Sequence, residues 1–241
     1  MENRKINILY EDEDVVAIEK PAGLSVHGDG KNENYVLTDW VIENYPDIKG
    51  VGEIMTINGK EIERPGIVHR LDKDTSGVML VAKNQKFFAF LKAQFKNREI
   101  IKKYYALVHG EIIKNSGVIN RPIGRSAKDS RMRSAQRGAK GKMRDAETEY
   151  KKIIAKKDYS FLELLPKTGR THQLRVHLKA IDHPILCDSL YAGKRGSGLG
   201  MKGLALHAGE ISFYNLDGKK ITVVSAIPKE IKNAVAKLKI L

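Results

Sequence analysis

Between His69 and Lys83 a charged, polar segment passes directly into an apolar strand. The polar part brings an Arg, an Asp and a Lys close together, and residues 78–82 have the composition of a buried strand. Chains more often place Asn, Gly or Pro where a loop meets a strand. The fold must therefore bury residues 78–82 while it holds a charged loop at their start, and functional side chains often gather on a loop fixed to a rigid scaffold.

The rest of the chain alternates many short strands with a few helices. The patterns predict strands at residues 6–10, 15–19, 78–82, 102–109, 146–155, 159–165, 204–207 and 221–225, and helices at 34–45, 85–97, 171–181 and after Pro228. We find no internal repeat and no linker between two folds. The sequence therefore predicts a single α+β domain over residues 1–241, with a mixed, mainly antiparallel sheet flanked by helices and loops.

Composition narrows the classes of protein that the chain can belong to. No apolar run reaches the roughly 18 residues of a membrane span, and no signal peptide is evident. The single cysteine, Cys187, cannot form an internal disulfide. Neither Cys nor a carboxylate lies at ligand spacing among His172, His177 and His183, so we expect no metal site. These features predict a cytoplasmic protein that does not bind membranes.

The net charge of +14 favours a polyanionic partner, although a merely basic surface would give the same total. Much of the charge lies in residues 121–144, a segment without helical or strand periodicity. Nine basic side chains, Arg125, Arg131 and Arg133 among them, stand there beside one acid, Asp129. This segment is expected to be a mobile basic loop or an extended hairpin that follows a phosphate backbone. The alternative is a solvated surface loop.

Asp72 is the first candidate for chemistry. Taken alone, an Asp beside an Arg such as Arg70 is more often part of a structural ion pair or a helix cap than a nucleophile. Its neighbours His69, Lys73 and Asp74 add polar and charged side chains that the apolar strand after them does not need in order to fold. The loop is therefore either a catalytic loop or a plain phosphate-binding turn.

The second candidate is the tyrosine pair in residues 102–110. A strand over 102–109 would place Tyr104 on one face and Tyr105 on the other, which is the usual arrangement of one core and one surface residue. The neighbouring Lys103 and an exposed ring would also suit the stacking of a nucleotide base.

The third candidate is the start of the helix predicted at 171–181, where Thr171 can serve as N-cap. Arg170, His172 and Gln173 stand at this helix start, which favours an anion. His172 and Arg175, three residues apart, can share a polar face. The alternative is a solvated basic face.

Together with residues 11–24, 183–191 and 206–208, these stretches resemble the RluA-type family of RNA pseudouridine synthases. The resemblance runs over about residues 8 to 228 in the family's order. Many members carry Gly where this chain has Cys187. Longer members carry an S4-like RNA-binding domain before the catalytic core, and this chain is expected to lack it.

The resemblance implies the family's fold, with an active-site cleft across the sheet. It also implies isomerisation of specific uridines in structured RNA, either rRNA or tRNA, to pseudouridine. Asp72 corresponds to the nucleophile, Tyr104 to the residue that stacks on uracil and assists proton transfer, and Arg175 to the partner of the aspartate. Arg70 would hold the flipped state. Further contacts to RNA are expected from His69, Lys103, Arg125, Arg131, Arg133, Arg170, His172 and Gln173.

The isomerisation oxidises nothing and loses no group, so no cofactor is expected. RNA is the expected partner of a monomer that needs no other protein. One alternative is a catalytically silent RNA-binding or ribosome-assembly protein on the same scaffold. Another is a glycoside-cleaving enzyme, which would want a second carboxylate; only Asp74 is near in sequence, and Trp40 is the only tryptophan for stacking a sugar. The target RNA and uridine stay open.

Overall fold

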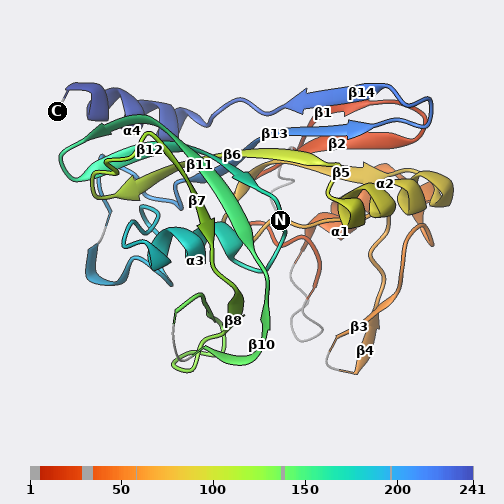
Figure 1. The fold of residues 1–241 in the computed structure, drawn as a ribbon. Coiled ribbons are helices and arrows are strands. Elements are labelled where there is room, and N and C mark those ends of the chain that lie inside the picture. The colour runs from red at the N-terminus through yellow and green to blue at the C-terminus, as the bar shows by residue number, and fades with distance from the viewer. Residues whose placement is uncertain (1–5, 29–34, 58, 137–138, 196, 241) are drawn as a thin grey trace. The chain divides into compact units, whose positions relative to one another are not determined.

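The computed structural model describes residues 6–28, 35–57, 59–136, 139–195 and 197–240 (Figure 1). The chain folds into two compact units. The first comprises Met1–Ile101 and Glu210–Ser225, and the second comprises Lys102–Gly209 and Ala226–Leu241. The chain passes from the second unit into the first within β13 (Leu206–Tyr214). The sequence predicted a single domain, and the division of the chain into two compact units leaves that as a prediction.

The first unit has an antiparallel sheet with the strand order β1-β2-β5-β13, and β14 pairs with β13. Its strands are β1 (Asn7–Glu11), β2 (Val15–Lys20), β5 (Ser76–Ala82) and β14 (Lys220–Val224), beside the end of β13. It also contains the helices α1 (Leu37–Asn44), η1 (Pro46–Ile48) and α2 (Gln85–Asn97) and a hairpin of β3 (Met55–Ile57) and β4 (Lys60–Ile62). Ile18, Leu80 and Phe87 are fully buried at the centre of this unit.

Helix α2 forms where the pattern predicts it. Asn84 caps it by accepting the N–H of Phe87 at 2.9 Å, and Arg98 ends it in a left-handed conformation. The side-chain amide of Gln94 is buried and bonds both the N–H and the C=O of Tyr214, so it ties α2 to the end of β13 as a strand neighbour would.

The second unit is built on a sheet with the order β6-β12-β11-β7. Its strands are β6 (Ile101–His109), β7 (Ser116–Asn120), β11 (Glu147–Lys156) and β12 (Tyr159–Pro166), and its helices are α3 (Gln173–Ala180), η2 (Gly193–Arg195) and α4 (Lys229–Ile240). Figure 1 shows α3 and α4 on opposite faces of this sheet. Leu107, Leu162 and Leu178 are fully buried between these elements.

The basic segment forms a small antiparallel sheet of its own, with the order β10-β8-β9. Its strands are β8 (Ile123–Arg125), β9 (Arg133–Ser134) and β10 (Lys140–Arg144). The extended hairpin is therefore the alternative that the structure supports, and residues 121–144 are called the basic hairpin below.

The predicted α+β class with a mostly antiparallel sheet is confirmed. The N-cap expected at Thr171 is wrong, because α3 begins at Gln173 behind His172, whose φ is 57°. The helix predicted at 34–45 is observed from Leu37, and Asn34 lies outside the described residues. Cys187 has a φ of 59°, a left-handed backbone that favours glycine and so accounts for the Gly of many family members. Among the described residues, no helix is long and apolar enough to cross a membrane.

Candidate active site

In the first unit, the loop that carries Asp72 is anchored by a buried lysine. Asp72 is half-buried, and its carbonyl accepts the N–H of Thr75 at 3.1 Å, which closes a turn just before β5. The carbonyl of Lys73, inside this turn, accepts the Gly23 N–H at 2.9 Å and Nζ of Lys20 at 3.0 Å. The Asp72 loop is thus fastened to the end of β2.

Lys20 itself is fully buried at the end of β2. Its ammonium group also donates to the carbonyls of Pro21 and Leu24, at 2.8 and 2.9 Å. Burial lowers the pKa of Lys20 to about 8, and the negative charges of Asp74 and Asp72 partly oppose that shift. Lys20 therefore supplies a positive charge beneath the carboxylates of the loop.

A cleft of about 320 Å³ lies beside the loop; residues 25–28 and Arg70, Leu71 and Lys73 form its walls. Nη1 of Arg70 is 3.1 Å from Nε2 of His27. Burial, together with the positive charges of Arg70 and Arg64, lowers the pKa of His27, and its contact with the Gly28 carbonyl opposes that shift. Because Arg70 and Lys73 are cations on its walls, the cleft attracts anions.

His69 is held by the protein framework. Its Nε2 accepts the N–H of Leu80 at 2.9 Å, and its ring stacks on Phe95 with centroids 4.8 Å apart. These contacts fix the start of the Asp72 loop against β5 and α2. His69 was expected to contact RNA, and these contacts give it a supporting role in the loop.

In the second unit, β6 places Tyr104 and Lys103 on opposite faces. Tyr104 lies opposite Leu164 of β12, and Tyr105 lies opposite Glu163. The Lys103 side chain is on the Tyr105 face, where its Nζ is 4.0 Å from Glu163. The Tyr105 ring stacks on Phe161 and packs so closely on Gly209 that a Cβ there would approach it to 2.6 Å. The structure therefore does not bring Lys103 to Tyr104.

Arg175, on α3, is held by a carboxylate that was not expected as its partner. Its Nε and Nη2 each donate to Asp188 at 2.7 Å, and both residues are buried. Asp188 also accepts the N–H groups of Leu190 and Tyr191, at 3.0 Å each. The Tyr191 ring faces the guanidinium group, with 5.0 Å between Cζ and the ring centroid. Such a two-point pair fixes the plane of the guanidinium group.

The other candidates around α3 differ in their exposure. Gln173 is buried, and its amide is engaged by Thr168, Arg170, Glu147 and Thr148, so it serves the framework rather than presenting a group to RNA. The Arg170 side chain donates from Nε to the Asp145 carbonyl at 3.0 Å. His172, in its left-handed conformation, has Nδ1 2.8 Å from the Tyr191 hydroxyl. A residue held in this way is often found at a functional site.

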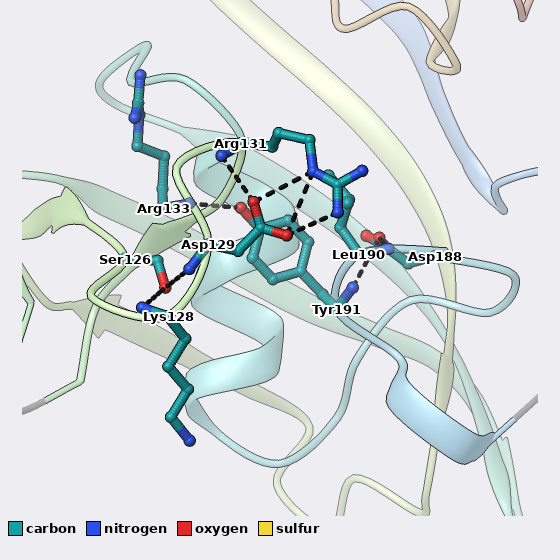
Figure 2. A network of polar contacts seen from close by, with 8 residues as sticks. All are labelled: Ser126, Lys128, Asp129, Arg131, Arg133, Asp188, Leu190 and Tyr191. Atoms are coloured by element: carbon teal, nitrogen blue, oxygen red, sulfur yellow. Dashed lines mark hydrogen bonds and ion pairs between the residues drawn. The ribbon is translucent and has the colours of Figure 1, made fainter.

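Figure 2 shows how the tip of the basic hairpin is ordered. Ser126 Oγ accepts the N–H groups of Lys128 and Asp129, and Asp129 accepts both the N–H and the guanidinium of Arg131. Arg131 and Asp129 are an exposed ion pair 2.7 Å apart. Arg125 is also exposed, and the N–H of Arg133 donates to the Tyr191 hydroxyl. The predicted basic residues thus share one ordered element.

Sequence reasoning missed Lys20 and His27, which lie beside the Asp72 loop, and it missed Asp188 and Tyr191 as the residues that hold Arg175. Asp188 and Tyr191 lie in one of the family-like segments, but nothing in the pattern shows that they face Arg175. Lys20 was placed in a turn, and a lysine is seldom fully buried. Among the described residues, no group of three or more His, Cys, Asp or Glu side chains is arranged to hold a metal ion.

Comparisons with known proteins agree on the family to which this chain belongs. A family model described as RNA pseudouridylate synthase matches residues 14–180. An RNA pseudouridine synthase of Synechocystis is 34% identical over 239 residues, covering 99% of this chain and 70% of the relative. Ribosomal large subunit pseudouridine synthase D of Borreliella burgdorferi is 40% identical over 195 residues, covering 81% of this chain and 57% of the relative.

A solved structure supports the same fold. The human protein titled RNA pseudouridylate synthase domain containing 4 is 27% identical and superposes with a TM-score of 0.75, covering 97% of this chain and 93% of the human one. Most of the segments that resembled the RluA-type family lie within the matched region, whereas residues 183–191 and 206–208 lie C-terminal to it. The chain therefore belongs to the RluA-type family of RNA pseudouridine synthases, enzymes that isomerise uridine in RNA.

Proposed function

We propose that this protein isomerises specific uridines of structured RNA, with Asp72 as its nucleophile. The N1–C1′ bond of the target breaks, the uracil turns, and C1′ is rejoined to C5. The observation that supports this best is the loop itself: a half-buried carboxylate on a turn fixed by Lys20, beside a cationic cleft. The names of relatives such as pseudouridine synthase D favour large-subunit rRNA as the substrate over tRNA.

The charges around Asp72 suit a nucleophile. A carboxylate attacks as an anion, and cations beside it create a positive potential at the site of attack. Lys20 lies beneath the loop, and Arg70 and Lys73 are on the wall of the cleft. Asp72 adds to the ribose or to the base and is released when the new bond has formed. Overall, C5 loses its proton and N1 gains one, so no redox partner is needed.

We assign the remaining chemistry by the resemblance to the family. Tyr104 stacks on the uracil and assists the transfer of the C5 proton, a task for which a positioned phenol is suited. Arg175 pairs with the nucleophile as well as with Asp188. Arg70, an exposed residue on the wall of the cleft, supports the flipped state, because a base that leaves its stack costs a few kcal/mol that protein contacts must offset.

The basic hairpin provides grip on the RNA. Arg125, Arg131 and Arg133 stand on one ordered element, so their charges reach a phosphate backbone without first being ordered. Lys103 and Gln173 contribute less to this grip, since the first is tied to Glu163 and the second is buried.

The test is tritium release from RNA labelled at uridine C5, purified from cells that lack this gene. The wild type should release tritium, whereas Asp72→Asn should release none and bind the same RNA within about threefold, because the substitution removes a charge but little volume. Turnover by Asp72→Asn would remove Asp72 from the role of nucleophile. Free uracil among the products would indicate cleavage instead of isomerisation. RNA binding by the wild type without release would favour the catalytically silent alternative.

A further inference from the structure

Tyr191 lies at a junction within the second unit. Its contacts there go beyond apolar packing. It is 3% exposed and belongs to a small apolar cluster with Val176 and Ile123, against which Met132 packs, so this cluster joins α3 to the base of the basic hairpin. The Tyr191 ring faces the Arg175 guanidinium group. One side chain therefore touches both the element expected to grip RNA and the arginine expected to act on the nucleophile.

The hydroxyl group of Tyr191 contacts two elements at this junction. It accepts the backbone N–H of Arg133 in β9 at 2.8 Å, as Figure 2 shows. The same hydroxyl group is 2.8 Å from Nδ1 of His172, and it can donate one hydrogen bond and accept two. The Tyr191 hydroxyl group therefore contacts β9 and the residue before α3 at the same time.

Arg175 is held from two sides at this junction. Asp188 fixes its guanidinium plane through two bonds of 2.7 Å, and the backbone N–H of Tyr191 donates to the same carboxylate. A displacement of Tyr191 therefore moves both the ring that faces Arg175 and a donor to the carboxylate that holds it. Buried pairs of this kind depend on close geometry.

We propose that Tyr191 is a positioning residue that couples RNA contact at the basic hairpin to the orientation of Arg175. The proposal rests on the function proposed above and adds to it a link between binding and the chemical step. RNA held by Arg125, Arg131 and Arg133 pulls on β9, whose Arg133 N–H holds the Tyr191 hydroxyl. The ring then fixes Arg175 in the orientation that serves catalysis.

Tyr191→Phe is the sharpest variant, because it keeps the ring and removes both hydroxyl contacts. At saturating RNA its rate of tritium release should fall about tenfold, while the half-saturating RNA concentration changes less than about threefold. Tyr150→Phe is the matched control. It removes a hydroxyl from β11 of the same unit, where the ring packs on Gly117, and it should keep the wild-type rate. A rate for Tyr191→Phe within about twofold of wild type would overturn the proposal.

A double-mutant cycle separates coupling from plain damage. Arg131→Gln with Arg133→Gln leaves the Arg133 N–H in place and should lower both affinity and the saturated rate in the wild-type background. In the Tyr191→Phe background it should lower affinity alone, since the link is already broken. Equal factors on the saturated rate in both backgrounds would contradict coupling, whatever the loss of stability.

A second readout does not depend on turnover. The NMR signal of the Arg175 Nε–H, identified by its loss in Arg175→Lys, should shift when oligouridine of about ten nucleotides is added to the wild type. The shift should at least halve in Tyr191→Phe. Equal shifts in the two proteins, or none in the wild type, would refute the link even if tritium release proved Asp72 catalytic. A shift without tritium release would instead retain the link and reject the proposed reaction.

Discussion

Lys20 shows how a buried charge can shape the loop above it. Three backbone carbonyls surround its ammonium group, including that of Lys73 between Asp72 and Asp74. Burial of a charge is costly unless hydrogen bonds compensate, and here the hydrogen bonds fasten the functional loop. Burial of Lys20 thus lowers the stability of the folded protein in exchange for a fixed loop and a positive potential near a carboxylate.

This exchange predicts how Lys20→Met changes stability with pH. The pKa of Lys20 is lowered to about 8 in the folded protein from 10.5, so between these values the unfolded chain binds more protons than the folded one. The free energy of unfolding of the wild type should therefore gain about 3 kcal/mol from this group as the pH rises through the window. Below pH 8 the burial cost is fully present.

Urea denaturation of both proteins from pH 7 to about 10.5 measures the effect, because the difference between them cancels the other titrating groups. The stability of Lys20→Met relative to the wild type should fall as the pH rises through the window. A difference that stays constant with pH would show that Lys20 keeps an ordinary pKa in the folded state.

Residues that the sequence suggests as catalytic or RNA-binding are not always accessible to a substrate. His69 and Gln173 stand in charged motifs, yet His69 accepts the Leu80 N–H and Gln173 is buried with its amide fully engaged. Conversely, Tyr191 gave no chemical signal of its own. A pattern shows which groups are near in sequence, but hydrogen-bond partners such as Arg133 and His172 come from elements that only the fold brings together.

At the scale of elements, the basic hairpin is a separately testable part. Its three arginines at 125, 131 and 133 should be replaced together by Gln. If each contacts one phosphate, the slope of log affinity against log salt should become shallower by about 2, since each contact contributes about 0.7 for a single strand. Filter binding over a salt series measures this slope.

The matched control neutralises three exposed lysines of α4, namely Lys229, Lys232 and Lys239. Net charge falls equally in both variants, so a general electrostatic effect would change both slopes alike. A specific hairpin contact changes the slope of the arginine variant alone. Equal slopes for the two variants would mean that the hairpin is only one part of a generally basic surface.

The strands of this hairpin could not be predicted from the sequence, although its charge could. β9 has only two residues, and every residue of β10 is exposed, so no alternation of buried and exposed positions marks them. The long elements were different: α2 has the bounds 85–97 that the periodicity predicts, because Phe87, Phe88 and Leu91 share a buried face.

For the whole molecule, the α+β class followed from the count and spacing of strands, but the division into units did not. Each unit is discontinuous in sequence, and β13 runs from one into the other. The pattern predicted this strand only over residues 204–207, since its extension to Tyr214 includes Gly209, which Tyr105 requires for close packing. Such long-range contacts leave no local signal.

The net charge of +14 leads to a prediction about the chain as a whole. RNA binding that neutralises about five phosphates should weaken about a hundredfold between about 50 and about 200 mM salt, because counterions released on binding oppose it. The half-saturating RNA concentration for tritium release should rise by the same factor. The rate at saturation should stay within about twofold, because buried pairs such as Arg175 with Asp188 are screened far less than surface charges. A saturated rate that falls in step with affinity would show that salt also acts on the chemical step, either through the link from the basic hairpin to Arg175 or on the catalytic groups themselves.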